Sequence, residues 1–561
     1  MKNFDKGSVF FICLLLLISL IFLRFFFKLG VPYTHDGNSH LARIGNLLIS
    51  LRDFHLPPRW APHLNYKFGY PVFNFNYYLP FLLVVPWKLA GFSIETSWKL
   101  VVFLSFWGGG VGFYFLARRF FNSWASFLGA VFYLLNPYQL ANIFVRGATG
   151  ETAAFGFLPW TLLAFYLLSQ KKTKSWFLIS VLLTACLALV HNIITMISFP
   201  FLLGFILLLG RQTKEKKGFF YRPLLWAWLM GILLSLYFWL PALLEKKYVT
   251  LDLVDMSHFY RDHFPTFRQL VANDWGYGFS VAGPDDGMSF SLGPFHFLLV
   301  FLTSLFFLLK KKWLEAKPVF ISFFFLSYWL AFFLMLEVSG SIWQGLPLVS
   351  YVQFPWRLLF LTTFNGALII SFSMNLFKEK KLKIGLGLGL ILIVSFLNLP
   401  KAKPQSLFHY PDYVYYEFPF TSSIKDENMP IWFDKEKNYQ LEEKLTSQPE
   451  GGVSFEVEKW QTGRHFYQAM VKEAVQVFEK TAYFPGWKVY IDDQAKEIDY
   501  RQEKYPGLIS YELTPGKHRI KTVFTEDTWP RKIGDGLSLL TLGGLLVILF
   551  WPKAVFDDQK N

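Results

Sequence analysis

The chain has 561 residues, of which 53% are hydrophobic and 20% aromatic, while only 17% are charged. Soluble domains usually carry about 25% charged residues, so this composition excludes an ordinary soluble protein and indicates a polytopic α-helical membrane protein. The formal net charge of +15 does not indicate a nucleic-acid partner, because the basic residues gather in short stretches between apolar runs.

The first apolar run begins near residue 8. It is followed by Arg24, three phenylalanines and Lys28 rather than by a small-residue cleavage site. We therefore predict that it remains in the protein as the first membrane span. Cys13 and Cys186 both fall inside predicted spans, so they predict neither a disulfide framework nor a thiolate metal site.

Further apolar segments follow, and the basic stretches between them set the predicted topology. Short loops rich in Lys and Arg stay in the cytoplasm. With the N-terminus inside, every basic cluster lies on the cytoplasmic side and the C-terminus is also cytoplasmic. About twelve spans are predicted, at residues 8–27, 97–117, 123–137, 152–169, 176–190, 193–210, 223–241, 293–309, 318–337, 356–377, 383–399 and 535–551.

Residues 77–92 are apolar but short, and they contain Pro80 and Pro86. Counting them as a span would turn every later basic cluster outward, so we interpret 32–96 as one external segment that dips into the membrane interface. The predicted external segments are 32–96, 138–151, 191–192, 242–292, 338–355 and 400–534. They hold most of the distinctive polar residues, which predicts an active face outside the cytoplasm.

Residues 401–530 lack apolar runs of spanning length and alternate polar with apolar residues at 453–458, 487–491, 508–513 and 518–524. This alternation between turn signals is typical of antiparallel strands. We predict a small extracytoplasmic β-sandwich domain, followed by a final transmembrane helix and cytoplasmic tail over 531–561. The domain either contacts carbohydrate or stabilises the protein as a lid, and the absence of a chemical-looking cluster favours the lid.

Several short motifs carry a resemblance to known proteins. They are His35-Asp36-Gly37, Tyr70-Pro71-Val72-Phe73-Asn74, Val145-Arg146-Gly147-Ala148 with Glu151, Val190-His191-Asn192-Ile193, Gln353-Phe354-Pro355-Trp356-Arg357, and Tyr483-Phe484-Pro485-Gly486-Trp487 with Pro515-Gly516. With them the chain resembles the GT-C glycosyltransferase superfamily, and more closely the bacterial membrane family named as related to 6-pyruvoyl-tetrahydropterin synthase. It is also similar to multi-span proteins that glycosylate lipoteichoic acid. No zinc–histidine site of a pterin enzyme is evident, so the family name implies no pterin chemistry.

The resemblance implies a GT-C-like transmembrane domain over 1–400, with a catalytic first external loop at 32–96. It implies transfer of a sugar from a polyprenyl-phosphate donor to an envelope glycan, lipid or protein, by a multi-pass protein of the cell membrane. Asp36 is expected to be the general base of an inverting displacement. The alternative for Asp36 is a helix cap. The alternatives for the chain are a transporter or flippase of lipid-linked intermediates and a non-catalytic envelope scaffold.

Arginine suits bidentate phosphate contacts, so Arg146 and Arg357 are expected to hold the donor phosphate. An internal ion pair between Arg146 and Glu151 remains the alternative. The other candidate substrate-binding residues are His35, His40, Arg43, Arg59, Lys67, Glu151 and His191. A divalent cation stays open as a cofactor, but no metal ligands are assigned.

Overall fold

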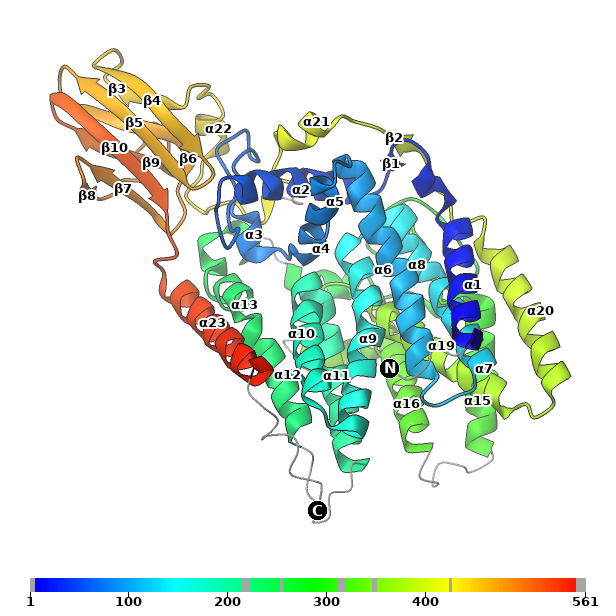
Figure 1. Cartoon of the computed structure of the whole chain (residues 1–561). Coiled ribbons are helices and arrows are strands. Elements are labelled where there is room, and N and C mark those ends of the chain that lie inside the picture. The colour runs from blue at the N-terminus through cyan, green and yellow to red at the C-terminus, as the bar shows by residue number, and fades with distance from the viewer. Residues whose placement is uncertain are drawn as a thin grey trace.

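The computed structural model describes residues 6–212, 222–252, 256–309, 318–345, 351–422 and 426–550. The predicted cytoplasmic tail at 551–561, the basic cluster at 310–312 and most of the basic stretch at 211–222 lie outside the described residues. Figure 1 shows three layers: a bundle of long helices, a layer of short elements across one end of it, and a β-domain beyond that layer.

Each predicted span contains helical residues. The long helices are α1 (Lys6–Phe22), α6 (Ile94–Ala117), α7 (Ser123–Leu134), α9 (Thr149–Lys171), α10 (Lys174–Val190), α11 (Asn192–Gln212), α12 (Pro223–Leu234), α13 (Leu236–Leu244), α15 (Pro294–Leu309), α16 (Pro318–Leu334), α19 (Leu359–Leu376), α20 (Lys380–Asn398) and α23 (Trp529–Phe550). The span predicted at 223–241 is divided between two helices, α12 and α13. Within the described residues, six helices are long and apolar enough to cross a membrane, or up to nine if each bent pair is one span. A helical structure with several helices of membrane-spanning length is therefore confirmed, while the number twelve stays a prediction.

In the described part of the chain, three pairs of helices are bent at a short break in the backbone. In the first, Ser123–Leu134 is followed at 40° by Pro137–Arg146, which consists of α8 (Pro137–Ala141) and η2 (Asn142–Arg146). Proline fits the first position of a helix because the amide hydrogen that it lacks has no partner there. The second limb of this pair ends at Arg146, so the break in the helix decides where that side chain lies.

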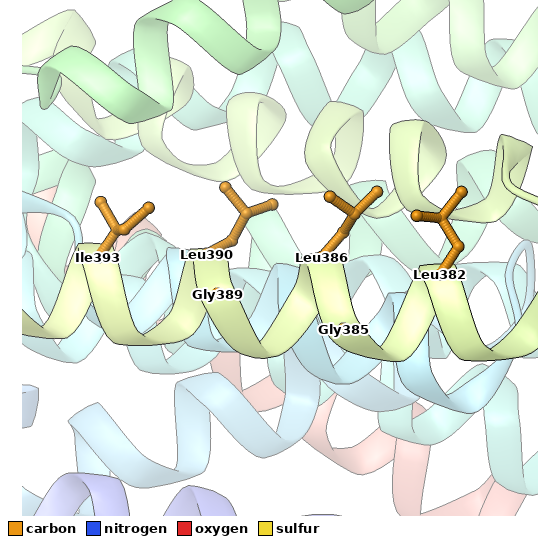
Figure 2. Close-up of a pocket in the computed structure, with 6 residues that line it drawn as sticks. All are labelled: Leu382, Gly385, Leu386, Gly389, Leu390 and Ile393. Carbon is orange, nitrogen blue, oxygen red and sulfur yellow. The ribbon is translucent and has the colours of Figure 1, made fainter.

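Two helices lie at the edge of the bundle. Only 17% of the apolar stretch of α20 and 22% of that of α23 are buried inside the protein. For the other four helices that are long enough to cross a membrane, the buried share is at least 56%. Figure 2 shows a groove along α20 with an entirely apolar lining, formed by Leu382, Gly385, Leu386, Gly389, Leu390 and Ile393. A surface of this kind suits contact with lipid tails and offers no group for chemistry.

A layer of short elements covers one end of the bundle, with α2 lying across it (Figure 1). It contains α2 (Gly37–Arg52), α3 (Val72–Phe75), α4 (Leu79–Leu82), α5 (Val85–Leu89), α21 (Asp412–Tyr416), and the antiparallel pair β1 (Val31–Pro32) and β2 (Leu407–Phe408). The segment 77–92 forms the two short helices α4 and α5 instead of one long helix. Further short helices are η1 (Arg24–Phe27), α14 (Phe267–Val271), α17 (Gly340–Gly345), η8 (Pro355–Leu358) and α22 (Lys435–Asn438).

The β-domain contains two antiparallel sheets. One has the strand order β4-β5-β10-β7-β8 and the other β3-β6-β9. The strands are β3 (Leu445–Gln448), β4 (Val453–Gln461), β5 (Arg464–Val471), β6 (Val475–Ala482), β7 (Trp487–Ile491), β8 (Gln494–Lys496), β9 (Leu508–Leu513) and β10 (Gly516–Phe524). All four predicted alternating segments are strands, so a β-rich C-terminal region is confirmed; its classification as a sandwich stays a prediction. A buried carboxylate links the sheets, because Glu479 of β6 accepts hydrogen bonds from His465 and Tyr467 of β5.

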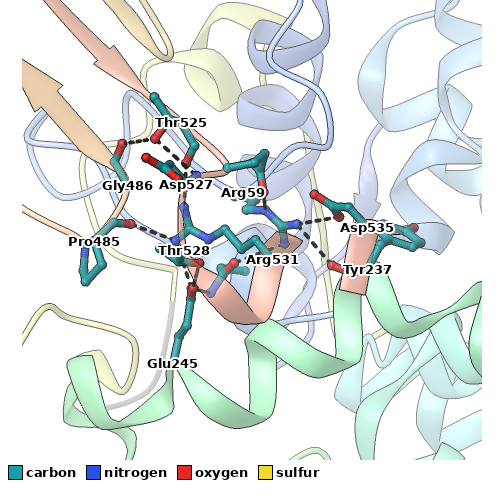
Figure 3. Close-up of polar contacts among 12 residues, drawn as sticks. Arg59, Tyr237, Glu245, Pro485, Gly486, Thr525, Asp527, Thr528, Arg531 and Asp535 are labelled. Carbon is teal, nitrogen blue, oxygen red and sulfur yellow. Dashed lines mark hydrogen bonds and ion pairs between the residues drawn. The ribbon is translucent and has the colours of Figure 1, made fainter. Parts of the chain in front are cut away.

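Buried charges join the β-domain to the helices where α23 begins (Figure 3). Arg531 of α23 donates from Nε and Nη2 to Glu245 Oε2 at 3.2 and 2.9 Å. It also donates to the carbonyl oxygens of Thr525 and Pro485 at 3.0 and 2.9 Å. Arg531 and Glu245 are both almost fully buried. The start of α23 is thereby fixed to the end of α13 and to the β-domain.

Arg59 completes this group from the loop after α2. It donates to Glu526 at 2.5 Å, to Asp535 at 3.2 Å, to the Tyr237 carbonyl at 3.1 Å and to Asn74 at 3.3 Å. We call the set formed by Arg59, Glu245, Glu526, Arg531 and Asp535 the junction cluster. It connects four separate parts of the chain.

Candidate functional site

The N-terminal end of α2 is hydrogen-bonded to the loop between η2 and α9. The Asp36 amide donates to the Arg146 carbonyl at 2.9 Å, and the His40 ring nitrogen Nδ1 lies 3.0 Å from the Gly147 carbonyl. A carbonyl only accepts, so His40 Nδ1 carries the proton. These bonds fix Asp36 relative to the end of the bundle that the layer of short elements covers.

Gly147 is required at this contact. Its φ of +67° is a left-handed conformation that glycine adopts without strain. A Cβ atom there would lie 2.2 Å from Thr34 Oγ1 and 3.0 Å from the Gly37 amide nitrogen. The motif Val145-Arg146-Gly147 thus brings the first loop and the start of α9 into direct contact.

Asp36 occupies the N-cap position of α2, but its side chain makes no capping hydrogen bond. The residue is half-buried, and its carboxylate accepts no hydrogen bond from the described residues. It interacts electrostatically with Arg146 and Arg357. The carboxylate is therefore within electrostatic range of two arginines, while no described residue donates a hydrogen bond to it.

Arg146 and Glu151 form the ion pair that the sequence left as an alternative. Nη1 and Nη2 of Arg146 lie 2.7 and 2.8 Å from the two carboxylate oxygens. The Tyr138 hydroxyl donates to the same carboxylate at 2.8 Å, and the arginine lies over the Trp356 ring at 4.7 Å. All four side chains are buried. The positive charge of Arg146 is therefore largely matched within the protein.

Arg357 is buried but incompletely paired. Its Nη1 donates to Gln353 Oε1 at 2.9 Å, and its guanidinium lies over the Phe354 ring at 5.1 Å. Its Nε lies 3.8 Å from Glu151 Oε1, too far for a hydrogen bond, and has no partner among the described residues. A buried donor without a hydrogen-bond partner is costly, so this nitrogen is a candidate to bind a ligand.

Arg43 and the histidines surround this centre. Arg43 donates to the Ser422 carbonyl at 2.6 Å. Burial lowers the pKa of His40 to about 4, so its ring is neutral at physiological pH. His191 stacks on Tyr77 with centroids 4.7 Å apart, and its Nδ1 accepts from the amide of the third residue after it.

His35 connects the first loop to the predicted external segment 242–292. Its Nε2 donates to the Tyr277 carbonyl at 3.1 Å, and its ring stacks on Phe279 at 4.2 Å. Burial lowers the pKa of His35. Two segments that are far apart in sequence, and that were both predicted to be external, thus meet beside Asp36.

Sequence reasoning missed Glu427. This half-buried carboxylate interacts electrostatically with Arg43, Asp36 and Arg357, and burial raises its pKa. It lies in the segment after α21, within no motif and no regular pattern, so the sequence carried no signal for it. We call the following residues the Asp36 cluster: His35, Asp36, His40, Arg43, Tyr77, Arg146, Glu151, His191, Arg357 and Glu427.

Two predicted substrate-binding residues lie elsewhere. Arg59 belongs to the junction cluster, and Lys67 forms an ion pair with Glu417 at 2.7 Å. The other predicted site residues are all in the Asp36 cluster. Across the described ranges, no group of three or more His, Cys, Asp or Glu side chains is arranged to hold a metal ion.

A family model described as "6-pyruvoyl-tetrahydropterin synthase related domain; membrane protein" matches residues 75–401. This match covers more than half of the chain, so the chain belongs to that family of membrane proteins, as the resemblance predicted. No curated protein matches the chain.

Two glycosyl-transferring enzymes are among the solved structures that are similar to this chain. The arabinofuranosyltransferase AftD from Mycobacteria is 15% identical, with a TM-score of 0.46 over 73% of this chain and 29% of that chain. The oligosaccharyltransferase AglB from Archaeoglobus fulgidus, in complex with an inhibitory peptide and a dolichol-phosphate, is 14% identical. Its TM-score is 0.40, over 78% of this chain and 59% of that chain. The chain thus spans less than two thirds of either enzyme, and TM-scores below 0.5 do not establish a shared fold.

Proposed function

We propose that this member of the 6-pyruvoyl-tetrahydropterin synthase related family is a GT-C-type membrane glycosyltransferase. It moves a sugar from a polyprenyl-phosphate donor to an acceptor hydroxyl outside the cytoplasm. The observation that carries this proposal is that one cluster contains two groups without a hydrogen-bond partner: the Asp36 carboxylate accepts no hydrogen bond from the described residues, and Arg357 Nε donates none to them. The reaction needs a base that deprotonates the acceptor hydroxyl and a cation that binds the donor phosphate, and this cluster offers both.

Asp36 takes the proton from the acceptor hydroxyl in this mechanism. The acceptor oxygen attacks the anomeric carbon from the face opposite the phosphate. The bond from that carbon to the phosphate oxygen breaks, and the lipid phosphate leaves with the electron pair, which inverts the configuration. A carboxylate placed within hydrogen-bond reach contributes about 10²–10⁴-fold to the rate of such a step.

Arg357 binds the donor phosphate and stabilises the charge that develops on it. Arginine presents a planar fork that suits phosphate oxygens, and a fixed cation at a leaving group lowers the barrier. Arg146 has a different role. Its bidentate bond to Glu151 leaves less of its charge for a ligand, so it positions the loop whose carbonyl accepts from the Asp36 amide.

An Asp36→Asn variant tests the proposal. The carboxylate makes no hydrogen bond that folding requires, so the variant is expected to keep the thermal stability of the wild type. Loss of the base is expected to reduce sugar transfer by about 10²–10⁴-fold. The measurement is transfer from a panel of polyprenyl-phosphate sugars by the full-length protein in proteoliposomes.

Asp53→Asn is the matched control, because Asp53 stands at the opposite end of α2 and accepts hydrogen bonds from Thr462 of the β-domain. It is expected to retain transfer. Full transfer by Asp36→Asn would overturn the assignment of the base. Wild-type protein that moves lipid-linked sugars across the bilayer without transferring them would identify a flippase instead.

A further inference from the structure

Three aromatic rings remain exposed where the loop after α2 meets the segment after α21. Tyr66 is 41% exposed, Phe420 56% and Tyr439 36%. The ring of Tyr66 lies 4.6 Å from that of Tyr439 and 5.9 Å from that of Phe420. Phe420 thus lies edge-on to Tyr66 and Tyr439 is tilted against it, and we call these three exposed, contacting rings the aromatic platform. Apolar surface gathered in this way marks an interaction site.

The loop that presents Tyr66 adopts an unusual backbone. Asn65, Tyr66 and Lys67 have φ values of 56°, 52° and 67°. Bulky residues rarely adopt left-handed conformations, and such strain tends to occur at functional sites. Specific bonds hold it in place: the Tyr439 hydroxyl donates to Asn65 Oδ1 at 2.8 Å, and the Tyr66 amide donates to the Pro419 carbonyl at 2.6 Å.

Charged groups border the platform. Lys67 Nζ lies 2.7 Å from one oxygen of Glu417, and His63 Nδ1 lies 3.2 Å from the other. Burial opposes ionisation of Glu417, but Lys67 and His63 outweigh it and lower the pKa of the carboxyl. The side chains of Lys67 and Glu417 are 58% and 46% exposed, so both a donor and a charged acceptor face solvent.

The platform adjoins the Asp36 cluster. Phe420 is two residues before Ser422, whose carbonyl accepts the 2.6 Å hydrogen bond from Arg43. Arg43 interacts electrostatically with His40 and Glu427. The same segment of chain thus carries a ring of the platform and a partner of the candidate active site.

We propose that the aromatic platform binds a glycan chain and that this glycan is the acceptor of the transferred sugar. The C–H faces of sugar rings are apolar and pack on aromatic rings, while their hydroxyls exchange hydrogen bonds with Glu417 and Lys67. Binding of the glycan is independent of the proposed function, and its role as the acceptor rests on that function.

A membrane surface is the competing occupant, because Tyr and Trp also collect at lipid headgroups. Figure 1 places α22 beside the β-domain, on the side of α2 that faces away from the long helices. Tyr439 directly follows α22 and bonds to Asn65 of the α2–α3 connection. The platform is therefore separated from the long helices by the layer of short elements, which favours a soluble glycan.

Tyr66→Ala and Phe420→Ala test this inference in the full-length protein in nanodiscs. Binding to an array of bacterial envelope oligosaccharides is expected to weaken by about tenfold in each variant, the size of one lost aromatic contact. The KM for the glycan acceptor should rise by a similar factor, while the KM for the lipid donor stays unchanged. Phe420 has an exposed side chain, so its replacement does not disturb the core.

Phe54→Ala is the matched control. Phe54 is 79% exposed and has a φ of +56°, but it stands at the end of α2, outside the platform. It is expected to bind glycans as the wild type does. Wild-type protein that binds no oligosaccharide, or platform variants that lose affinity for anionic vesicles instead, would overturn the inference. If the variants lose glycan binding while the wild type transfers no sugar, the platform stands and the proposed function fails.

Discussion

The junction cluster and the Asp36 cluster both combine arginines with carboxylates, but they differ in how completely these groups are paired. In the junction cluster, every nitrogen of both guanidinium groups donates a hydrogen bond. Its members come from the first loop, α13, α23 and the linker before α23. Buried charges paired this fully leave nothing for a ligand, so their role is to hold the parts of the protein together.

The Asp36 cluster is paired only in part. Glu151 is matched by Arg146, whereas the Asp36 carboxylate accepts no hydrogen bond from the described residues and Arg357 Nε donates none to them. If the Asp36 cluster is the active site, as we propose, the difference means that a concentration of buried charge does not by itself identify such a site. The informative feature is the group that folding leaves unsatisfied.

Replacing Arg531 is expected to have the largest effect on stability. Arg531→Leu leaves Glu245 charged and buried without its guanidinium, and breaking a buried pair in this way costs about 3–5 kcal/mol. Arg357→Leu provides the contrast, because Glu151 keeps its bidentate bond to Arg146. Thermal unfolding in detergent is expected to show a large drop in Tm for the first variant and a small one for the second. Equal drops would contradict the distinction between the two clusters.

Local patterns made much of the fold predictable. Apolar length located the helices, and period-two alternation located β4, β7, β9 and β10, because both signals depend on residues close in sequence. The family motifs likewise directed attention to Asp36, Arg146 and Arg357. These predictions needed no knowledge of which segments meet in space.

Contacts between segments far apart in the chain could not be predicted in this way, because they depend on which segments meet in space. Arg59 was assigned to the substrate because it is a basic residue in an external loop, yet its carboxylate partners, Glu526 and Asp535, are far along the chain. Glu427 was missed for the same reason. A polar residue in an external segment can bind a substrate or complete a structural cluster, and only the three-dimensional arrangement of the loops decides between the two.

The second prediction concerns the stability of the folded protein at acidic pH, to which His40 of the Asp36 cluster contributes. His40 has a pKa of about 4 in the folded protein, because burial disfavours its charged form, against 6.5 as the ordinary value. Between these values the unfolded chain binds the proton and the folded chain does not. The contribution of His40 to the free energy of unfolding is therefore fully present above pH 6.5 and is lost as the pH decreases toward 4. The loss is about 1.4 kcal/mol for each unit of difference in pKa.

His40→Gln keeps a hydrogen-bond donor for the Gly147 carbonyl but removes the side chain that takes up a proton. Thermal midpoints between pH 7 and 4 are expected to fall less steeply for this variant than for the wild type. Some slope will remain, because burial also lowers the pKa of His55, to about 3. If the thermal midpoints of the variant and the wild type fell in parallel, protonation of His40 would not contribute to the loss of stability in acid.

Gly147→Ala tests whether the loop positions the base. Gly91→Ala is the control, because both glycines have positive φ, at 67° and 93°, but a Cβ at Gly91 meets no described atom within 4 Å. Both variants incur the backbone strain, about 1–3 kcal/mol. Only the Cβ at residue 147 displaces Thr34 and the backbone that holds Asp36, and a misplacement of about 1 Å costs about 10²-fold in rate. Transfer rates at saturating donor should therefore fall for Gly147→Ala alone. Similar rates for both variants would mean that this contact does not set the position of Asp36.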